Sequence, residues 1–445
     1  MSIPLRAARR SARRLGWGLA DQALSSLTNF AVGVVVARSV SGHDFGAFAL
    51  AFSVYTVALG VSRALSTEAF VVRYSAAQPG RARPAARRAT GTSLATGAAC
   101  LAVFGVVGAV LGAGRGLAWS LGATMPGLLL QDGWRYVFFA AGEGRRAFAN
   151  DAVWALLMVP AFLVAHVVAA HSAAAYLAAW GIAASGAAVF GILQTRLTPN
   201  PLRTVAWLRE HRTLWPRYLT ESVAITATQQ LYLFAVGAVG GLSVVGRLKL
   251  VQIALGPVNV VAQGVGVVAV PEAVRARRSG LRRLDVVAAA ISLIIGASAL
   301  CWGLLVYALP HRWTTHVVGT GWLVAAALVI PMTLAQTLNG ANTGAFVGLR
   351  AFGAARQSMR VRCLASVTTV GGALVGVQLA GVQGAAYGLV VAAAVNLVVW
   401  WLAYVVQRGR HRDDPAIGDL RAETDGFAAW PADVPEADPA PAVSR

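Results

Sequence analysis

The hydrophobic residues of the chain occur in long, uninterrupted stretches. A helix needs about 20 mostly apolar residues to cross a bilayer. Five stretches without Asp, Glu, Lys or Arg exceed that length: 89–114, 152–195, 286–311, 313–349 and 364–407. Two of them, 152–195 and 364–407, are long enough for two spans each. Because the runs are continuous rather than alternating, they predict helices and not membrane strands.

The full pattern predicts an all-α polytopic membrane protein with twelve transmembrane helices. The long stretches break near His171–Ser172 and Gly381–Gly384, where small or polar residues favour a turn. The predicted helices are roughly 15–37, 44–65, 90–113, 117–140, 152–170, 174–195, 217–239, 242–270, 286–309, 315–347, 363–380 and 384–406.

The basic residues predict how these helices are oriented. When the loops are assigned alternately to two sides, 31 of the 38 basic residues fall on one side and only Arg38, Arg115 and Arg312 on the other. Loops rich in arginine and lysine stay in the cytoplasm. Both termini are therefore predicted to be cytoplasmic in a multi-pass plasma-membrane protein with an even number of spans.

The two halves of the chain resemble each other at an offset of 200 residues. The offset pairs Asp21 with Glu221, Asn29 with Gln229, Gly46 with Gly246 and Leu50 with Leu250. A parallel repeat of this kind predicts two six-helix bundles with substrate bound between them. The predicted parts are a basic arm (1–14), a first bundle (15–195), a linker (196–216), a second bundle (217–406) and a disordered cytoplasmic tail (407–445). The residues from Asp413 onwards carry eight acids and two arginines.

Polar residues inside the spans gather in the first, second, fourth, seventh, eighth and tenth predicted helices. A charged side chain in hydrocarbon costs several kcal/mol, so it usually faces a cavity or a partner. We therefore expect these six helices to line a central cavity. The substrate-binding candidates are Arg63, Arg135, Arg247, Lys249, Asn29, Gln229, Gln252 and Asn259. The candidates for ion coupling or charge pairing are Asp21, Asp132 and Glu221.

Structural explanations compete with these functional ones. Asp132 and Arg135 are i, i+3 neighbours and can form an ion pair with each other. Arg63 and Glu221 lie near span ends, from where their side chains can reach the interface. Asn259 can serve only to hydrogen-bond a neighbouring helix.

Composition excludes several classes of protein. The chain has 445 residues, of which 57% are hydrophobic and 13% charged, about half the charged fraction of a soluble domain. The net charge of +20 would suggest nucleic acid in a soluble protein, but its confinement to one side of the spans argues against that. Three cysteines in apolar runs indicate neither disulfides nor a metal site. No nucleotide-binding or nucleophile motif is found, so we expect no enzyme activity and no cofactor.

Several segments resemble a known family. They are Asp21-Gln-Ala-Leu-Ser-Ser-Leu-Thr-Asn29, Asp44-Phe-Gly46, Gln131-Asp132-Gly-Trp-Arg135 and Leu255-Gly-Pro-Val-Asn259 with Pro271-Glu272. Together they look like the polysaccharide-biosynthesis flippases of the multidrug/oligosaccharidyl-lipid/polysaccharide exporter superfamily. The resemblance, which covers about residues 15–406, implies two six-helix lobes. It also implies export of lipid-linked sugars or drugs by rocking between inward- and outward-open forms.

Three functions follow as hypotheses. In the first, the chain is a flippase for a lipid-linked oligosaccharide. Cations near the cavity would hold the anionic diphosphate of this substrate. Further partners would be membrane lipids and glycosyltransferases or a polymerase. In the second it is a cation-coupled drug exporter of the same fold, and in the third a scaffold for a polysaccharide synthase. A major-facilitator transporter is disfavoured, because the loop 73–88 lacks the Gly-x-x-x-Asp-Arg pattern usual there.

Overall fold

A computed structural model describes residues 3–75, 78–112, 114–222 and 228–413, and in these ranges the chain is helical and forms no strand. The predicted tail beyond residue 413 lies outside the described residues. The first group of helices is α1 (Ile3–Ser39), α2 (Gly42–Leu65), α3 (Thr67–Tyr74), α4 (Pro79–Val110), α5 (Arg115–Ala140), α6 (Gly144–Ala169) and α7 (Ala173–Thr195).

A connecting segment and a second group of helices follow. The connection holds η1 (Pro201–Arg203), α8 (Thr204–Glu210) and α9 (Trp215–Ser222). The second group is α10 (Thr228–Gly240), α11 (Leu242–Ala254), α12 (Pro257–Arg278), α13 (Leu281–Ala308), α14 (His311–Val318), α15 (Trp322–Ala325), η3 (Ala326–Leu328), α16 (Val329–Ala341), α17 (Thr343–Ala351) and α18 (Ala355–Asp413).

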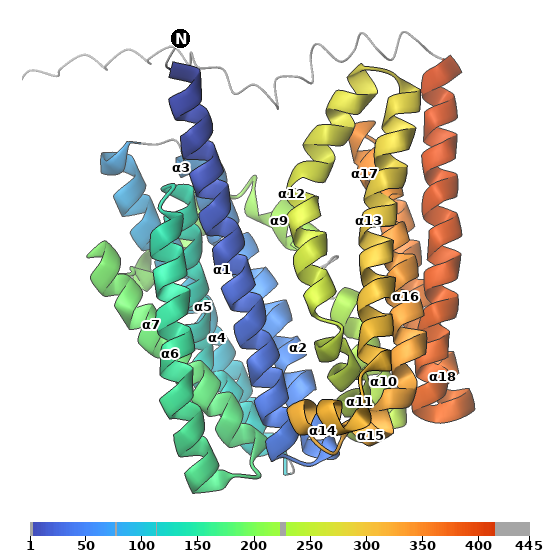
Figure 1. The fold of residues 1–445 in the computed structure, drawn as a ribbon. Coiled ribbons are helices and arrows are strands. Elements are labelled where there is room, and N and C mark those ends of the chain that lie inside the picture. Colours follow the sequence, from blue (N-terminus) through green and yellow to red (C-terminus); the bar gives the residue numbers. More distant parts are fainter. Residues whose placement is uncertain (1–2, 76–77, 113, 223–227, 414–445) are drawn as a thin grey trace, which may run out of the picture.

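The two groups stand side by side (Figure 1). We call α1–α7 the first lobe and α10–α18 the second lobe. The end of the molecule at which α1 begins carries most of the arginines and is called the basic side. The opposite end, where α14 and α15 lie in Figure 1, is called the far side.

In the described part of the chain, eight helical segments are long and apolar enough to cross a membrane, which makes this a multi-pass membrane protein. They are Gly16–Ser39, Gly42–Tyr74, Gly80–Val110, Gly144–Ala169, Ala173–Thr195, Leu281–Ala308, Trp322–Ala351 and Arg356–His411. The last contains a kink at Ala380 and Gly381, where Gly381 has φ 58°. Helix covers most of the described part of each predicted range, but the number twelve stays a prediction.

Two predicted helices were wrong in their extent. The range 242–270 is not one helix, because it breaks after α11 and restarts at Pro257, whose missing N–H suits the first turn of a helix. The range 315–347 is divided between α14 and the helices from α15 to α17, with a turn at Gly319 (φ 101°). The predicted arm is helical from Ile3 and continues directly into the first span, which begins at Gly16.

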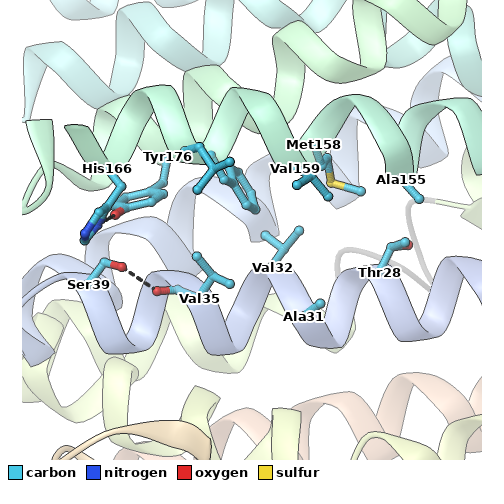
Figure 2. A pocket seen from close by; sticks show the side chains of 12 residues that line it. Thr28, Ala31, Val32, Val35, Ser39, Ala155, Met158, Val159, His166 and Tyr176 are labelled. Atoms are coloured by element: carbon cyan, nitrogen blue, oxygen red, sulfur yellow. Dashed lines mark hydrogen bonds between the residues drawn. The ribbon is translucent and has the colours of Figure 1, made fainter. Parts of the chain in front are cut away.

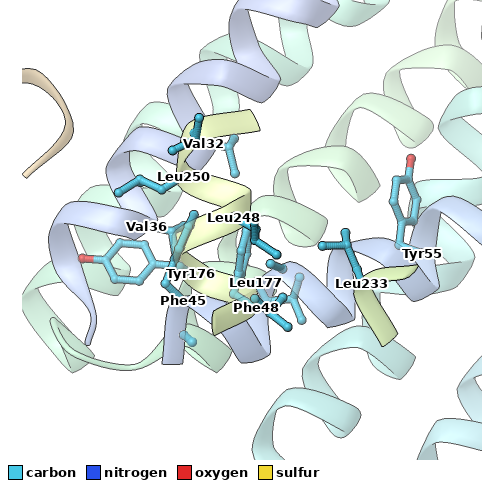
Figure 3. Close-up of a cluster of buried hydrophobic side chains, with 14 of the residues drawn as sticks. Val32, Val36, Phe45, Phe48, Tyr55, Tyr176, Leu177, Leu233, Leu248 and Leu250 are labelled. Atoms are coloured by element: carbon cyan, nitrogen blue, oxygen red, sulfur yellow. The ribbon is translucent and has the colours of Figure 1, made fainter. Parts of the chain in front are cut away.

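The buried cores show where the lobes meet. One cluster combines side chains of both lobes, including Val36 and Phe48 of the first and Leu233 and Leu248 of the second (Figure 3). Two further clusters lie toward the basic side, and each draws on one half of the chain only. One includes Trp134 and Phe138, and the other includes Leu284 and Tyr404. The lobes therefore share a core toward the far side and have separate cores toward the basic side.

Two glycines allow the closest approach between the lobes. Helices α2 and α11 pack against each other. A Cβ atom at Gly46 would overlap the backbone of Leu242, and one at Gly246 would overlap the carbonyl oxygen of Gly42. Only residues without a side chain let two helix backbones come this near. These are the two glycines that the 200-residue offset pairs.

A second contact between the lobes involves the short helix α14. The Arg38 guanidinium, at the end of α1, donates to the carbonyl oxygens of His316 (2.6 Å) and Val317 (3.4 Å). These carbonyls lie in the last turn of α14, where a helix has no acceptor partners of its own and carries partial negative charge. The first lobe thus caps a helix of the second.

The connecting segment is fixed to the first lobe. Trp207 is fully buried and donates to the carbonyl oxygen of Leu65 at 3.1 Å. The His211 ring lies 3.9 Å from the Trp207 ring, and burial lowers the pKa of His211. Glu210 accepts from Arg88 at 2.6 Å and from the Tyr74 hydroxyl at 3.1 Å. The connecting segment therefore belongs to the first lobe, and a hinge between the two lobes would lie after it in the chain.

Candidate functional site: two adjoining cavities

A polar cavity of about 680 Å³ lies within the first lobe. It is bordered by α1, α2, α3, α5 and α6, and it reaches Ser75 and Ala140 at the basic-side ends of α3 and α5. Its charged lining residues are Arg63, Asp132, Arg135 and Asp151. Neutral polar groups of Gln22, Ser25, Asn29 and Gln131 stand among them.

Arg63 and Asp132 form a two-pronged ion pair across this cavity. Arg63 Nε donates to Asp132 Oδ2 at 2.9 Å, and Nη2 donates to Oδ1 at 2.6 Å. The guanidinium also lies 5.0 Å from the centre of the Tyr136 ring. This parallel geometry is the strongest that an arginine and a carboxylate adopt. It places Arg63 at the cavity and not at the membrane interface.

Arg135 binds two other carboxylates. Its Nε donates to Asp21 Oδ2 at 2.7 Å, its Nη2 lies 2.5 Å from the same oxygen, and its Nε lies 3.6 Å from Asp151 Oδ2. Asp21 is fully buried, and its Oδ1 has no hydrogen-bond partner among the described residues. The side chain of Arg135 is 15% exposed. This guanidinium therefore joins α1, α5 and α6 in the interior of the lobe.

Asp132 and Arg135, which their i, i+3 spacing allows to pair, do not form an ion pair with each other. Spacing along one helix permits that contact, but each side chain points to another helix, where it finds a better-aligned partner. The network of Arg63–Asp132 and Arg135–Asp21 connects three predicted cavity helices, the first, second and fourth. Their spacing in the sequence contains no information about this cross-helix choice.

Sequence reasoning missed the contribution of α6. Asp151 and Asn150 are buried, and Gln131 Nε2 donates to both, at 2.7 Å to Asp151 Oδ1 and 3.2 Å to Asn150 Oδ1. The predicted range of the fifth helix starts at 152 and therefore leaves out both of these polar residues. The helix begins at Gly144, which puts both residues two turns inside it. The adjacent Asn150-Asp151 pair was the available signal.

A second cavity, of about 690 Å³, adjoins the first between the two lobes. Gln22, Asn29 and Phe52 line both cavities. Most of the second cavity is apolar, with Trp302, Trp313 and Trp322 in its lining and residues of α14 at its far-side end. The two spaces therefore share part of their wall, and one is lined by charged groups and the other by aromatic rings.

Lys249 is the charged group of the second cavity. Its Nζ lies 5.5 Å from the centre of the Phe52 ring, which is within cation–π range. Among the residues that the structure describes, it has no carboxylate partner. Asn259 also lines this cavity.

The remaining candidates are placed differently. Arg247 and Gln252 are partly buried on α11 but line neither cavity. The side chains of Glu221 and Gln229 lie outside the described part of the structure. In that described part, no group of three or more His, Cys, Asp or Glu residues could hold a metal ion.

No protein-family model matches the chain, and no curated protein matches it. Solved structures do match over nearly its full length. An inward-facing multidrug resistance MATE family transporter of the MOP superfamily has 16% identity, a TM-score of 0.62 and coverage of 89% of this chain and 95% of that one. The lipid II flippase MurJ in an inward closed conformation has 12% identity, a TM-score of 0.66 and coverage of 95% and 94%. The chain therefore has the fold of MOP-superfamily transporters.

Proposed function

We propose that the chain is a flippase that moves a lipid-linked oligosaccharide or polysaccharide precursor across the plasma membrane by alternating access. The observation that carries this proposal is the junction of a charged cavity with an apolar, aromatic one. A lipid-linked sugar has a polar head, an anionic diphosphate and an apolar chain. The adjoining cavities offer each of these parts a matching surface.

The charges suggest how such a molecule would be held. Arg63 and Arg135 already have carboxylate partners, whereas Lys249 has none among the described residues. A cation without a partner in a low-dielectric site attracts an anion strongly. We assign the diphosphate to Lys249 and the sugar hydroxyls to the polar groups of the first lobe. Gln22 and Asn29 would contact both parts.

The same proposal includes the topology. The basic side is cytoplasmic, twelve spans form two six-helix bundles, and glycosyltransferases or a polymerase act beside the chain. The shared far-side core, the α2–α11 crossing and the Arg38 contact close the outer end in this conformation. Substrate would enter from the cytoplasm and leave after the lobes separate at the far side.

A reconstitution experiment tests the proposal. The purified chain is placed in liposomes with a fluorescent lipid-linked oligosaccharide, and the fraction accessible to an external quencher is followed over time. We expect exchange between leaflets with the wild type and its loss with Lys249→Met, whereas Arg145→Ala, an exposed position on the basic side, should behave as the wild type. If the lipid exchanges between leaflets as fast in protein-free liposomes as in liposomes with the wild type, the proposal is overturned.

A specific observation favours a second candidate, a cation-coupled drug exporter. The first lobe holds three buried carboxylates, Asp21, Asp132 and Asp151, against two arginines. A proton or a metal cation would neutralise the excess negative charge, and that ion would be the one whose movement is coupled to export. Deletion of the gene distinguishes the candidates: drug sensitivity with intact surface polysaccharide supports the exporter, and loss of surface polysaccharide supports the flippase. A scaffold for a synthase would keep its function in Lys249→Met.

A further inference from the structure

A third space lies on another face of α1 and shares one lining residue, Val32, with the second cavity. It is a groove of about 360 Å³ between α1 and α6, closed at one end by Tyr176 of α7 (Figure 2). Its floor consists of buried side chains, Val32, Met158 and Tyr176. Its rim is formed by side chains that are largely exposed, among them Val159 (60%) and Leu163 (61%). The groove therefore opens on the surface that faces lipid.

The groove is apolar along most of its length. Thr28 lies at the inner end, where its hydroxyl donates to the carbonyl oxygen of Leu24, and the Ser39 hydroxyl at the other end donates in the same way to the carbonyl oxygen of Val35. At the other end, Ser39 and His166 approach the far-side termini of α1 and α6, and His166 Nδ1 lies 3.0 Å from the Tyr176 hydroxyl (Figure 2). The occupant must thus be apolar in the middle of the membrane and polar at its surface.

The dimensions of the groove match one leaflet. Thr28 lies near the middle of the span Gly16–Ser39, and Ser39 is its last residue. Eleven residues of helix cover about 16 Å, and half of a bilayer's hydrocarbon core is about 15 Å. The groove therefore runs from the middle of the membrane to the far-side interface, as a single lipid chain does.

We propose that this groove binds one acyl chain of a bilayer phospholipid from the far-side leaflet, with its head group at Ser39 and His166. The groove shares only the side chain of Val32 with the lining of the second cavity, so it does not depend on the proposed transport function. Since α1 also lines both cavities, the bound chain would hold α1 against α6. The ligand belongs to the membrane and is not the transported molecule.

Photo-crosslinking tests this site directly. The full chain is reconstituted in nanodiscs that contain a phospholipid with a diazirine in one acyl chain, and labelled residues are mapped by mass spectrometry. We expect labelling at Met158, Val159 and Phe162 to exceed that at Val164 and Val168. The last two are as exposed to lipid as Val159 but do not line the groove. Equal labelling at all five would mean ordinary contact with the surrounding lipid and would overturn the proposal.

A matched pair of variants supplies the second measurement. Val159→Trp places an indole at the rim of the groove, and Val164→Trp places one on the same helix outside it; the two valines are 60% and 62% exposed. An indole that displaces roughly two methylenes of a bound chain should reduce labelling of Met158 about tenfold. Val164→Trp should leave it unchanged. Equal labelling in the two variants would contradict an acyl chain in the groove.

A competition arm identifies the class of lipid. Unlabelled phospholipid should dilute the signal in proportion to its mole fraction. Undecaprenyl phosphate at the same mole fraction should have no greater effect. If the polyprenyl lipid displaces the label far more efficiently, the groove holds a carrier lipid and the phospholipid proposal is wrong.

Discussion

The basic residues that line the two cavities differ in whether they have carboxylate partners. The first lobe contains Arg63 and Arg135, and both are paired with carboxylates on other helices. The second lobe places Lys249 beside an aromatic ring in a largely apolar space, with no carboxylate partner among the described residues. Buried charges that are paired hold a structure together, whereas a buried charge without a partner has a reason to be kept only if something else binds it. We propose that the paired charges of the first set are structural and that Lys249 recognises a ligand.

The largest effect is expected at the centre of the first lobe. Arg135→Ala would leave Asp21 and Asp151 without their cation, and breaking a buried ion pair from one side costs about 3–5 kcal/mol. Thermal unfolding in detergent should show a lower transition temperature, and Arg145→Ala, an exposed position at the start of the next helix, should not change it. Full stability in Arg135→Ala would remove the structural role from this network.

The next effect concerns the crossing of α2 and α11, where the two lobes pack against each other. Gly46→Ala adds a methyl group where the backbone of Leu242 lies, and overpacking of this kind costs about 1–3 kcal/mol. Gly42→Ala is the matched control on the same helix, because a Cβ there meets nothing within 4 Å. Spin labels on the two lobes should report a changed far-side distance in the first variant only. Identical distances in both would show that the crossing tolerates a side chain.

A smaller but more specific effect is expected at Lys249. Lys249→Met removes a charge that has no ion-pair partner among the described residues, so the transition temperature should be unchanged or higher. Binding of an anionic lipid-linked substrate should weaken about tenfold, because a hydrogen bond to a charged group contributes about 1.5–3 kcal/mol. Lys249→Arg keeps the charge and should retain most of the affinity. A stable variant with unchanged binding would show that Lys249 does not recognise the ligand.

The smallest effect is expected at the link between the lobes. Arg38→Ala removes the cap of α14 and should destabilise the conformation with a closed far side by about 1 kcal/mol. Spin-label distances should show a larger far-side-open population. Arg115→Ala is a suitable control, since Arg115 is also on the far side but contacts only Trp119 of its own helix among the described residues. No shift in population would mean that the contact is incidental to closure.

Sequence and structure agree most closely where the signal is local. Hydrophobic stretches predicted helices because a helix satisfies its own backbone hydrogen bonds in lipid, whatever its neighbours are. The break near Gly381 was predicted correctly, since glycine readily adopts the positive φ found there. The break before Pro257 was missed, although the proline was visible, because the apolar run continues through it.

The sequence by itself determined that the chain is a helical, multi-pass membrane protein, and it marked the polar residues that have to be sheltered from lipid. Only the tertiary structure decided which of these residues meet. Arg135 binds Asp21, 114 positions away, and not Asp132, three positions away. Packing between helices fixes such choices, because the geometry of an ion pair between two helices depends on the distance and angle between them. No local pattern in the chain encodes either quantity.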